Sequence, residues 1–269
     1  MAVTSHERAQ MKADASLKQR YEAVRARIAA AAVHRGHRAD DILLTVVTKL
    51  ASIDQIRELI ALGHMDFGES RVQTLLHRAA QIDEFMQRHR QLSSGRLVNL
   101  PDQVRWHMIG HLQRNKVRKV LGMVRLIHSV DSLRLAEEIQ VAAARRDEPV
   151  ELLVQVNTSG EKMKSGVAPA AACHLIEQID TMMNIRPRGL MCMGPLVQDP
   201  QLARPTFERC HEIFEDIRSA EVGGEQFDIL SMGMSNDFEV AIECGANIVR
   251  VGSAIFGSPL SAEDPSDIP

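Results

Sequence analysis

From residue 41 onward, short hydrophobic runs alternate with longer segments in which hydrophobic residues recur every three or four positions. The short runs are rich in Val, Ile and Leu, which is typical of strands buried in a parallel sheet. The longer segments have the spacing of amphipathic helices. Eight strands are predicted, at residues 43–48, 65–68, 104–109, 126–130, 151–157, 188–193, 227–232 and 247–251.

The order of these segments predicts the fold class. Strict alternation of strand and helix predicts a parallel sheet, and eight such units in about 250 residues predict a closed α/β barrel of the (β/α)8 TIM type. A doubly wound open sheet is the alternative, although six strands is its usual number. An amphipathic helix is predicted before the first strand from the spacing of Leu17, Tyr21, Val24 and Ile28.

The whole chain is expected to be one domain, residues 1–269. Its two ends, at about 1–12 and 261–269, are polar and are expected to be loose tails. Residues 91–102 contain Ser-Ser-Gly and a proline, which predicts a flexible loop between the second helix and the third strand. In a barrel this loop lies on the N-terminal face.

Composition narrows the classes of function. The 269 residues include 45% hydrophobic and 25% charged residues, which are ordinary globular values. The net charge of −3 predicts no nucleic-acid or anionic-membrane partner. No hydrophobic stretch approaches the roughly 20 residues that span a bilayer. Because the N-terminus also lacks a signal peptide's hydrophobic centre, a cytoplasmic protein with four reduced cysteines is expected.

In a barrel the C-terminal ends of the strands meet at one site. Lys49 directly follows the first hydrophobic run, and a lysine partly withdrawn from water there can form a Schiff base with a carbonyl. The alternative is a lysine that extends from the strand end into water. The other ends show no pair of carboxylates; they carry Gly68, Glu69, Ser70, His111, Asp131, Asn157, Met193, Ser231 and Arg250.

The last two strand ends favour a phosphate site. Barrels often bind phosphate in the loops after strands seven and eight. Residues 230–235 (LSMGMS) and 250–257 (RVGSAIFG) each offer a small residue, a hydroxyl and the start of a helix, although ordinary turns with capping serines have the same residues. A phosphate site beside Lys49 suggests pyridoxal 5′-phosphate (PLP). Arg250 would then lie near the pyridine nitrogen and keep it unprotonated, unless it forms an ion pair at the strand end.

Two other polar features are less specific. His107 and His111 are four positions apart, which on a strand separates them by about 13 Å, too far for one ion. No metal site is therefore expected, and a structural or pocket-wall role is favoured for both. The polar residues 157–166 predict either a lid, a partner-binding loop or solvated surface.

Seven segments, taken in order, carry a family resemblance. They are residues 47–49 (VTK), 67–73 (FGESRVQ), 106–116 (WHMIGHLQRNK), 156–157 with 164–166, 189–195 (GLMCMGP), 230–238 and 249–257. Together they resemble the pyridoxal phosphate homeostasis proteins, over most of the chain from about residue 46 to 257. The resemblance implies a single barrel like the N-terminal domain of bacterial alanine racemase.

The resemblance also implies how PLP is bound. The cofactor would be held as an imine on Lys49, with Arg250 by the pyridine nitrogen. The remaining cofactor-binding residues would be Ser231, Gly252 and Ser253 on the phosphate, Met232 and Met234 beside the pocket, and Ser70. The family usually has asparagine where this chain has Ser70, and often serine where it has Thr48.

Two functions are compatible with such a site. A racemase generally needs two bases, and Lys49 could be one. In related racemases the second is a tyrosine from an extra β domain, whereas Tyr21 lies in the opening helix and the chain ends soon after its barrel. His111 or a cysteine could replace it, but no feature marks them. A purely interacting scaffold would leave the convergence of Lys49 and Arg250 unexplained.

A non-catalytic carrier is therefore expected, which holds PLP as a reversible lysine imine and acts in intracellular PLP homeostasis. A weakly active PLP-dependent amino-acid racemase is the alternative. PLP is the expected partner, with PLP-dependent apoenzymes as further candidates, and the chain is expected to be a monomer.

Overall fold

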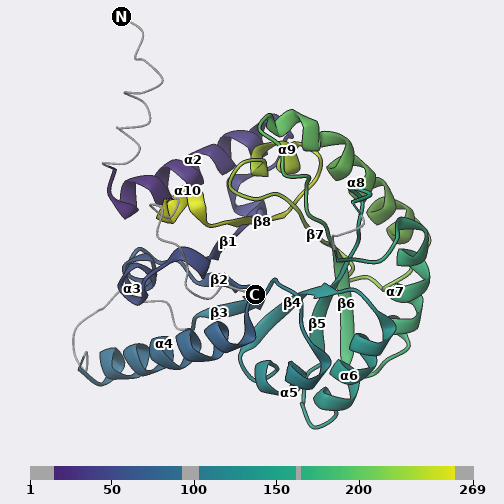
Figure 1. The fold of residues 1–269 in the computed structure, drawn as a ribbon, viewed down its shortest axis with the longest axis horizontal. Coiled ribbons are helices and arrows are strands. Elements are labelled where there is room, and N and C mark those ends of the chain that lie inside the picture. Colours follow the sequence, from purple (N-terminus) through teal and green to yellow (C-terminus); the bar gives the residue numbers. More distant parts are fainter. Residues whose placement is uncertain (1–14, 93–102, 162–164, 258–269) are drawn as a thin grey trace, which may run out of the picture.

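The computed structural model describes residues 15–92, 103–161 and 165–257. Within them, eight parallel strands close into a barrel in sequence order (Figure 1). The strands are β1 (Leu43–Val47), β2 (Asp66–Glu69), β3 (Arg105–Met108), β4 (Val124–Val130), β5 (Val150–Gln155), β6 (Ile185–Met191), β7 (Ile229–Ser231) and β8 (Ile248–Val251). The predicted (β/α)8 fold is confirmed.

Strand β6 differs most from its prediction, because it begins at Ile185 rather than at residue 188. Pro187 is paired with Leu152 of β5 and Gly189 with Leu153, so one extra residue lies between them on β6. A strand tolerates proline best at such an irregularity, where the missing N–H breaks no regular ladder. The proline therefore lies inside the strand and not before it.

Helices surround the barrel (Figure 1). They are α2 (Leu17–His34), α3 (Ile53–Ala61), α4 (Val72–Leu92), α5 (Val117–Val120), α6 (Leu133–Ala143), α7 (Ala172–Asp180), α8 (Arg204–Ser219), α9 (Phe238–Glu243) and α10 (Ser253–Phe256). Gln91 and Leu92, predicted to be in a loop, are the last residues of α4. The rest of that loop and both predicted tails lie outside the described residues. Among the helices of the described residues, none has the length and hydrophobicity needed to cross a membrane.

The predicted opening helix is α2, and it packs against α9 and α10 (Figure 1). Ser16 and Gln19 form a capping box at its start. Arg27 of α2 binds both carboxylate oxygens of Glu239 in α9, at 2.8 and 2.6 Å. Arg20 donates to the Ile255 carbonyl of α10 at 2.6 Å. Because α10 directly follows β8, α2 supports the segment that carries the predicted phosphate loop.

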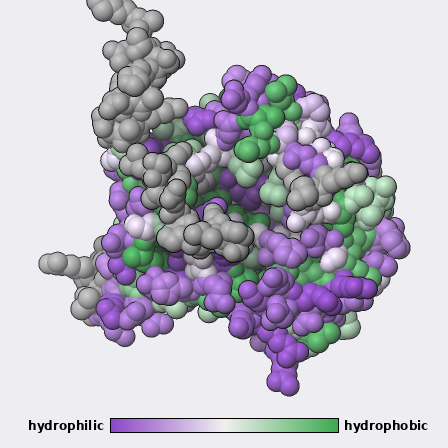
Figure 2. All heavy atoms as spheres, viewed as in Figure 1, coloured by the Kyte–Doolittle hydropathy of each residue, from purple (hydrophilic) through white to green (hydrophobic). Residues whose placement is uncertain are grey.

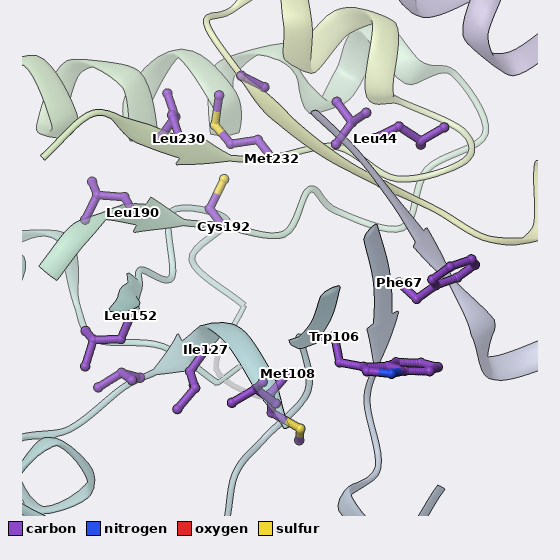
Figure 3. Packing of buried hydrophobic residues seen from close by; sticks show 14 of the residues in the cluster. Leu44, Phe67, Trp106, Met108, Ile127, Leu152, Leu190, Cys192, Leu230 and Met232 are labelled. Carbon is purple, nitrogen blue, oxygen red and sulfur yellow. The ribbon is translucent and has the colours of Figure 1, made fainter. Parts of the chain in front are cut away.

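Successive residues of the strands alternate between two hydrophobic layers. Figure 3 shows side chains that point away from the ring of strands, including Leu44, Phe67, Ile127, Leu152, Leu190 and Leu230. These belong to the main core between the barrel and the helices. The interior of the barrel holds a smaller cluster of Leu126, Leu153, Met191 and Ile248. The remaining interior positions carry polar side chains, and these lead to the site.

The outer surface of the face seen in Figure 2 is mostly hydrophilic, with hydrophobic residues in small separate groups. The N-terminal end of the barrel is closed by ion pairs. Glu151 of β5 binds Arg188 at 2.5 Å and also Arg125, and Arg188 binds Asp228 at 2.8 Å.

Candidate functional site

Lys49 lies just beyond β1, in a single 3-10 turn formed by Thr48–Leu50. Its side chain is exposed. Of the two possibilities left open by the sequence, the lysine that extends from the strand end into water is the one observed, because the strand ends at Val47 and the turn carries Lys49 into solvent. The position itself, at the C-terminal end of β1, is the predicted one.

The turn that carries Lys49 is held by a buried polar cluster. The Thr48 hydroxyl donates to the Glu69 carboxylate at 2.6 Å, and Glu69 is 2% exposed. Arg78, on α4, donates to the same carboxylate, to the Thr48 carbonyl and, at 2.8 Å, to the Ala51 carbonyl. One guanidinium thus binds both ends of the turn. This fixes the backbone from which the Lys49 amine extends.

Arg250 lies inside the barrel on β8 and is 4% exposed. Its guanidinium donates to the Ser231 hydroxyl at 2.7 Å and to the Cys192 carbonyl at 2.8 Å. Both hydrogen-bond acceptors are uncharged, and the charge of the buried Asp237 favours the cation from nearby. Burial lowers the pKa of Arg250 from its usual value. The alternative of an ion pair at the strand end does not describe these contacts.

Beneath Arg250, polar side chains continue through the barrel interior. The Ser231 hydroxyl lies 3.0 Å from His128 Nδ1, and His128 Nε2 lies 2.9 Å from His107 Nδ1. His107 Nε2 lies 3.1 Å from a carboxylate oxygen of Asp66. Burial first, then the nearby His107 and Arg250, lower the pKa of His128 well below its usual value.

Asp66 forms the other end of this series. Burial by itself raises the pKa of a carboxyl group, but hydrogen bonds from His107 and Arg105 bring the pKa of Asp66 down to about 2. Arg105 Nε donates to Asp66 at 2.8 Å. Asp66 is therefore a carboxylate at neutral pH, and it lies at the start of β2, at the opposite end of the barrel from Lys49.

The loops after β7 and β8 are tied together, as a phosphate site there would require. The Ser235 hydroxyl accepts from the backbone N–H groups of Gly252 at 3.1 Å and of Ala254 at 3.2 Å. Gly252 also lies against the end of β1, because a Cβ atom on it would be 2.9 Å from the Val47 carbonyl oxygen. The two loops and the turn of Lys49 therefore meet.

The other predicted cofactor-binding residues differ in their burial. The Met232 side chain is fully buried in the main core, beside Leu230 (Figure 3), and not at the mouth of the barrel. The alternation of strand residues explains this, since Ser231 points inward. Met234 and Ser253 are exposed, and Ser70 is half-buried next to Glu69. The Ser70 backbone packs against Gly110, where a Cβ atom would be 2.3 Å from the Ser70 oxygen.

His107 and His111 are separated, as the strand spacing predicts. His107 lies in the interior series, whereas His111 is mostly exposed with Nδ1 3.7 Å from Asp131. Within the described ranges, no three His, Cys, Asp or Glu side chains gather as metal ligands. Three of the cysteines are buried and Cys173 is half-buried, all of them free.

Three residues of this arrangement were missed in the sequence: Arg78, Asp66 and His128. His128 and Asp66 had one usable signal, which is a charged or titratable residue at an inward position of a predicted strand. Ser235 was part of the predicted phosphate loop 230–235, but its contact with the loop after β8 was not predicted. Arg78 had no signal, because an arginine on an amphipathic helix ordinarily faces solvent.

The chain is similar to one family model, to a named relative and to two solved structures. The family model for the alanine racemase N-terminal domain matches residues 32–259. A pyridoxal phosphate homeostasis protein of Aquifex aeolicus is 35% identical over 243 residues, which are 89% of this chain and 96% of that protein.

Two solved structures share the fold and part of the sequence. PipY of Synechococcus elongatus PCC7942, solved with PLP bound, is 30% identical, with a TM-score of 0.70 and coverage of 86% of this chain and all of that one. A protein of unknown function from Bifidobacterium adolescentis is 37% identical, with a TM-score of 0.78 and coverage of 89% and 94%.

Proposed function

The chain belongs to the alanine racemase N-terminal domain family and, within it, to the pyridoxal phosphate homeostasis proteins, and on this premise we propose that it binds PLP at the C-terminal end of its barrel as a non-catalytic carrier. The observation that carries the proposal is the meeting of three segments: the turn of Lys49, the loop of Ser235 and the loop of Gly252. Buried Arg250 supports it from below.

The residues fit the cofactor on two grounds. Gly252 lets the loop after β8 approach the end of β1 closely, because a Cβ atom on it would be 2.9 Å from the Val47 carbonyl oxygen, and the neighbouring Ser253 is exposed to a ligand. Arg250 is a buried cation with uncharged partners, and a cation there favours an unprotonated pyridine nitrogen. A carboxylate in its place would favour the protonated ring. The donor set therefore suits PLP that is held without strong electron withdrawal.

Each residue then has a separate task. PLP supplies an aldehyde that condenses reversibly with an amine, and Lys49 is the amine proposed for it. Gly252, Ser253 and Ser235 are proposed to bind the phosphate through backbone N–H and hydroxyl groups. Ser231 was expected on the phosphate too, and that stays a prediction, although its contacts favour support of Arg250. Met234 and Ser70 are proposed to flank the ring, and Met232 to support the loop from the core.

Carrier function is favoured over racemisation by where the possible second bases lie. Tyr21 is buried in α2, and its hydroxyl lies 3.2 Å from His64 Nδ1 near the N-terminal end of the barrel. It is therefore remote from Lys49. The four cysteines belong to the main core or pack against it. His111 is the remaining candidate, but its ring is 59% exposed and its Nδ1 lies 3.7 Å from Asp131. A single exposed amine can hold and release PLP without moving a substrate proton across two faces.

The first test is the absorption spectrum of the full chain with added PLP. Wild type should show a new band, and borohydride treatment followed by peptide mass spectrometry should find the cofactor on Lys49. Lys49→Ala should lose both signals, whereas Lys18→Ala, which changes an exposed lysine of α2, should keep them. Attachment at another lysine in wild type would overturn the site.

Racemisation is tested separately by incubating the PLP-loaded protein with L-alanine in D2O. We expect no deuterium at Cα and no D-alanine. Exchange that disappears in His111→Gln would establish the racemase instead. We further propose that the chain is one cytoplasmic, monomeric domain that transfers PLP to apoenzymes. Sedimentation should give about the 29.9 kDa of one chain. Mixing the PLP-loaded protein with an apoenzyme should restore that enzyme's activity faster than the same concentration of free PLP does.

A further inference from the structure

The side chains beneath Arg250 form a continuous series of hydrogen bonds through the barrel. It runs from Arg250 to Ser231, His128, His107 and Asp66, with distances of 2.7, 3.0, 2.9 and 3.1 Å. All five residues are at most 5% exposed. Its far end, Asp66, lines a cavity of about 650 Å³ between α2 and the starts of β1 and β2. The series therefore connects the two ends of the barrel.

Both ends of the series have a fixed hydrogen-bond direction. A guanidinium can only donate, so Ser231 Oγ accepts from Arg250. A carboxylate can only accept, so the hydrogen between His107 and Asp66 is on His107 Nε2. Because the Asp66 carboxyl is ionised at neutral pH, this second direction holds under ordinary conditions.

The directions in between follow from the two ends when both imidazoles are neutral. A neutral His107 with its hydrogen on Nε2 has a bare Nδ1, which must accept from His128 Nε2. A neutral His128 with its hydrogen on Nε2 has a bare Nδ1 in turn, and that atom accepts the Ser231 hydroxyl hydrogen. Every hydrogen is then assigned, and no polar atom of the series opposes another.

This arrangement decides what Ser231 can offer. Its only hydrogen points to His128, so towards Arg250 and towards any ligand it presents acceptor lone pairs alone. We propose that His107 and His128 are positioning residues for the PLP site: the neutral pair withdraws the Ser231 hydrogen and so makes Ser231 the fixed acceptor that orients the Arg250 guanidinium towards the pyridine nitrogen. The part that concerns PLP rests on the proposed function, whereas the hydrogen arrangement does not.

One added proton would reverse the series. A charged His107 would donate from Nδ1 to His128, which would then donate from Nδ1 to Ser231, and the serine hydrogen would be released. The charged groups around the pair act against each other: Arg250 from β8 and Arg105 from β3 disfavour the proton, and Asp66 from β2 favours it. The strong burial of His128 disfavours the added proton further.

The first arm of the test uses ¹⁵N-labelled, PLP-free full-length protein at pH 7.5. Long-range ¹H–¹⁵N spectra report which ring nitrogen of each histidine carries hydrogen. Both His107 and His128 should be neutral with hydrogen on Nε2 only, and His128→Asn and His107→Gln assign the signals. Hydrogen on His128 Nδ1, or a charged ring of either residue, would overturn the arrangement whether or not the protein binds PLP.

The second arm measures PLP affinity and the spectrum of the bound cofactor. His128→Leu leaves Ser231 without its acceptor, and affinity should fall about tenfold with a shifted band, the effect of one hydrogen bond to a charged group. His128→Asn can offer an amide oxygen near the place of Nδ1 and should recover most of the loss. His64→Gln changes another buried histidine, which contacts the Asp66 backbone carbonyl rather than the Asp66 side chain, and should bind like wild type.

Equal affinity and spectrum for His128→Leu and His64→Gln would overturn the positioning role even if the tautomers are as assigned. If His128→Leu does not fold, the comparison of His128→Asn with His128→Ala decides, because only the former keeps an acceptor for Ser231. Absence of any PLP binding by wild type would instead refute the proposed function, and the first arm would still decide the hydrogen arrangement.

Discussion

Arg250 places a positive charge in the barrel interior against uncharged acceptors. A buried cation whose hydrogen-bond acceptors are uncharged costs free energy, which an apolar side chain of similar length would not, although the charge of Asp237 offsets part of this cost. A site that exists to bind a ligand can carry this cost, since activity and stability often oppose each other. The arginine is therefore better explained by what it binds than by what it stabilises.

Replacement of this residue should separate the two effects. Arg250→Met should weaken PLP binding at least tenfold, yet change the free energy of unfolding by no more than about 1 kcal/mol, because the lost hydrogen bonds are offset by removal of the buried charge. Urea unfolding and PLP titration of the same preparation measure both. A loss of more than about 3 kcal/mol would mean that Arg250 is mainly structural.

His64 should make the protein less stable in mild acid. Burial lowers the pKa of His64 from 6.5 to about 4, so the unfolded chain binds a proton that the folded chain does not. Stability is therefore complete above about pH 6.5 and falls as the pH drops towards 4, by about 3 kcal/mol in all. His64→Gln should show a smaller decrease in unfolding free energy between pH 7 and 5. An equal decrease in both proteins would contradict this origin.

Among single residues, the sequence reveals those that break a hydrophobic pattern. Lys49 and Arg250 are visible because each is charged at the end of a buried run. The sequence left open whether Lys49 is exposed or partly withdrawn from water, because this depends on where β1 ends and the turn begins. The pairing of His128 with His107 was not visible either, since it depends on the register between β3 and β4, which includes an irregularity at Trp106 and His107.

At the scale of elements, the turn of Lys49 depends on α4 through Arg78. Arg78→Met should release the turn, leave Glu69 buried without its guanidinium, and reduce PLP affinity about tenfold together with a moderate loss of stability. Arg88→Met on the same helix removes only an exposed ion pair with Glu84 and should change neither. PLP titration and thermal unfolding compare the two; equal affinities would show that the turn needs no such support.

The close contact between β6 and β7 depends on Gly189. Its φ of +148° disfavours a side chain, and a Cβ atom would be 1.7 Å from the Ile229 carbonyl oxygen. Gly189→Ala should therefore lower the unfolding free energy by more than about 3 kcal/mol, because the two strands must separate. Gly122→Ala has no atom within 4 Å of its new Cβ and should be nearly neutral. Similar urea midpoints would contradict the contact.

The eight strands could be predicted because a parallel strand buried on both faces needs a continuous hydrophobic run. The start of β6 at Ile185 could not be predicted, because it depends on the pairing with β5, which no local pattern contains. The phosphate loops were recognisable by composition, but their connection through Ser235 depends on two segments 17 positions apart.

At the scale of the whole molecule, the barrel has two unlike ends joined by one polar series. The N-terminal end is closed by ion pairs around Glu151, and the C-terminal end brings the segments of Lys49, Ser235 and Gly252 together. Those segments come from β1, β7 and β8, which are adjacent because the barrel closes between β8 and β1. The proposed site therefore exists only when the ring is complete, and unfolding of any part removes it.

This dependence predicts that PLP stabilises the whole barrel. A ligand that binds only the folded chain adds about 2.7 kcal/mol at a hundredfold excess over its Kd, which for a domain of this size raises Tm by roughly 5–10 °C. Wild type should unfold in one cooperative transition that moves up with PLP, and Lys49→Ala should unfold at the wild-type temperature without PLP but not respond to it. Two separate transitions, with only one moved by PLP, would contradict a single domain whose site spans the closure of the ring.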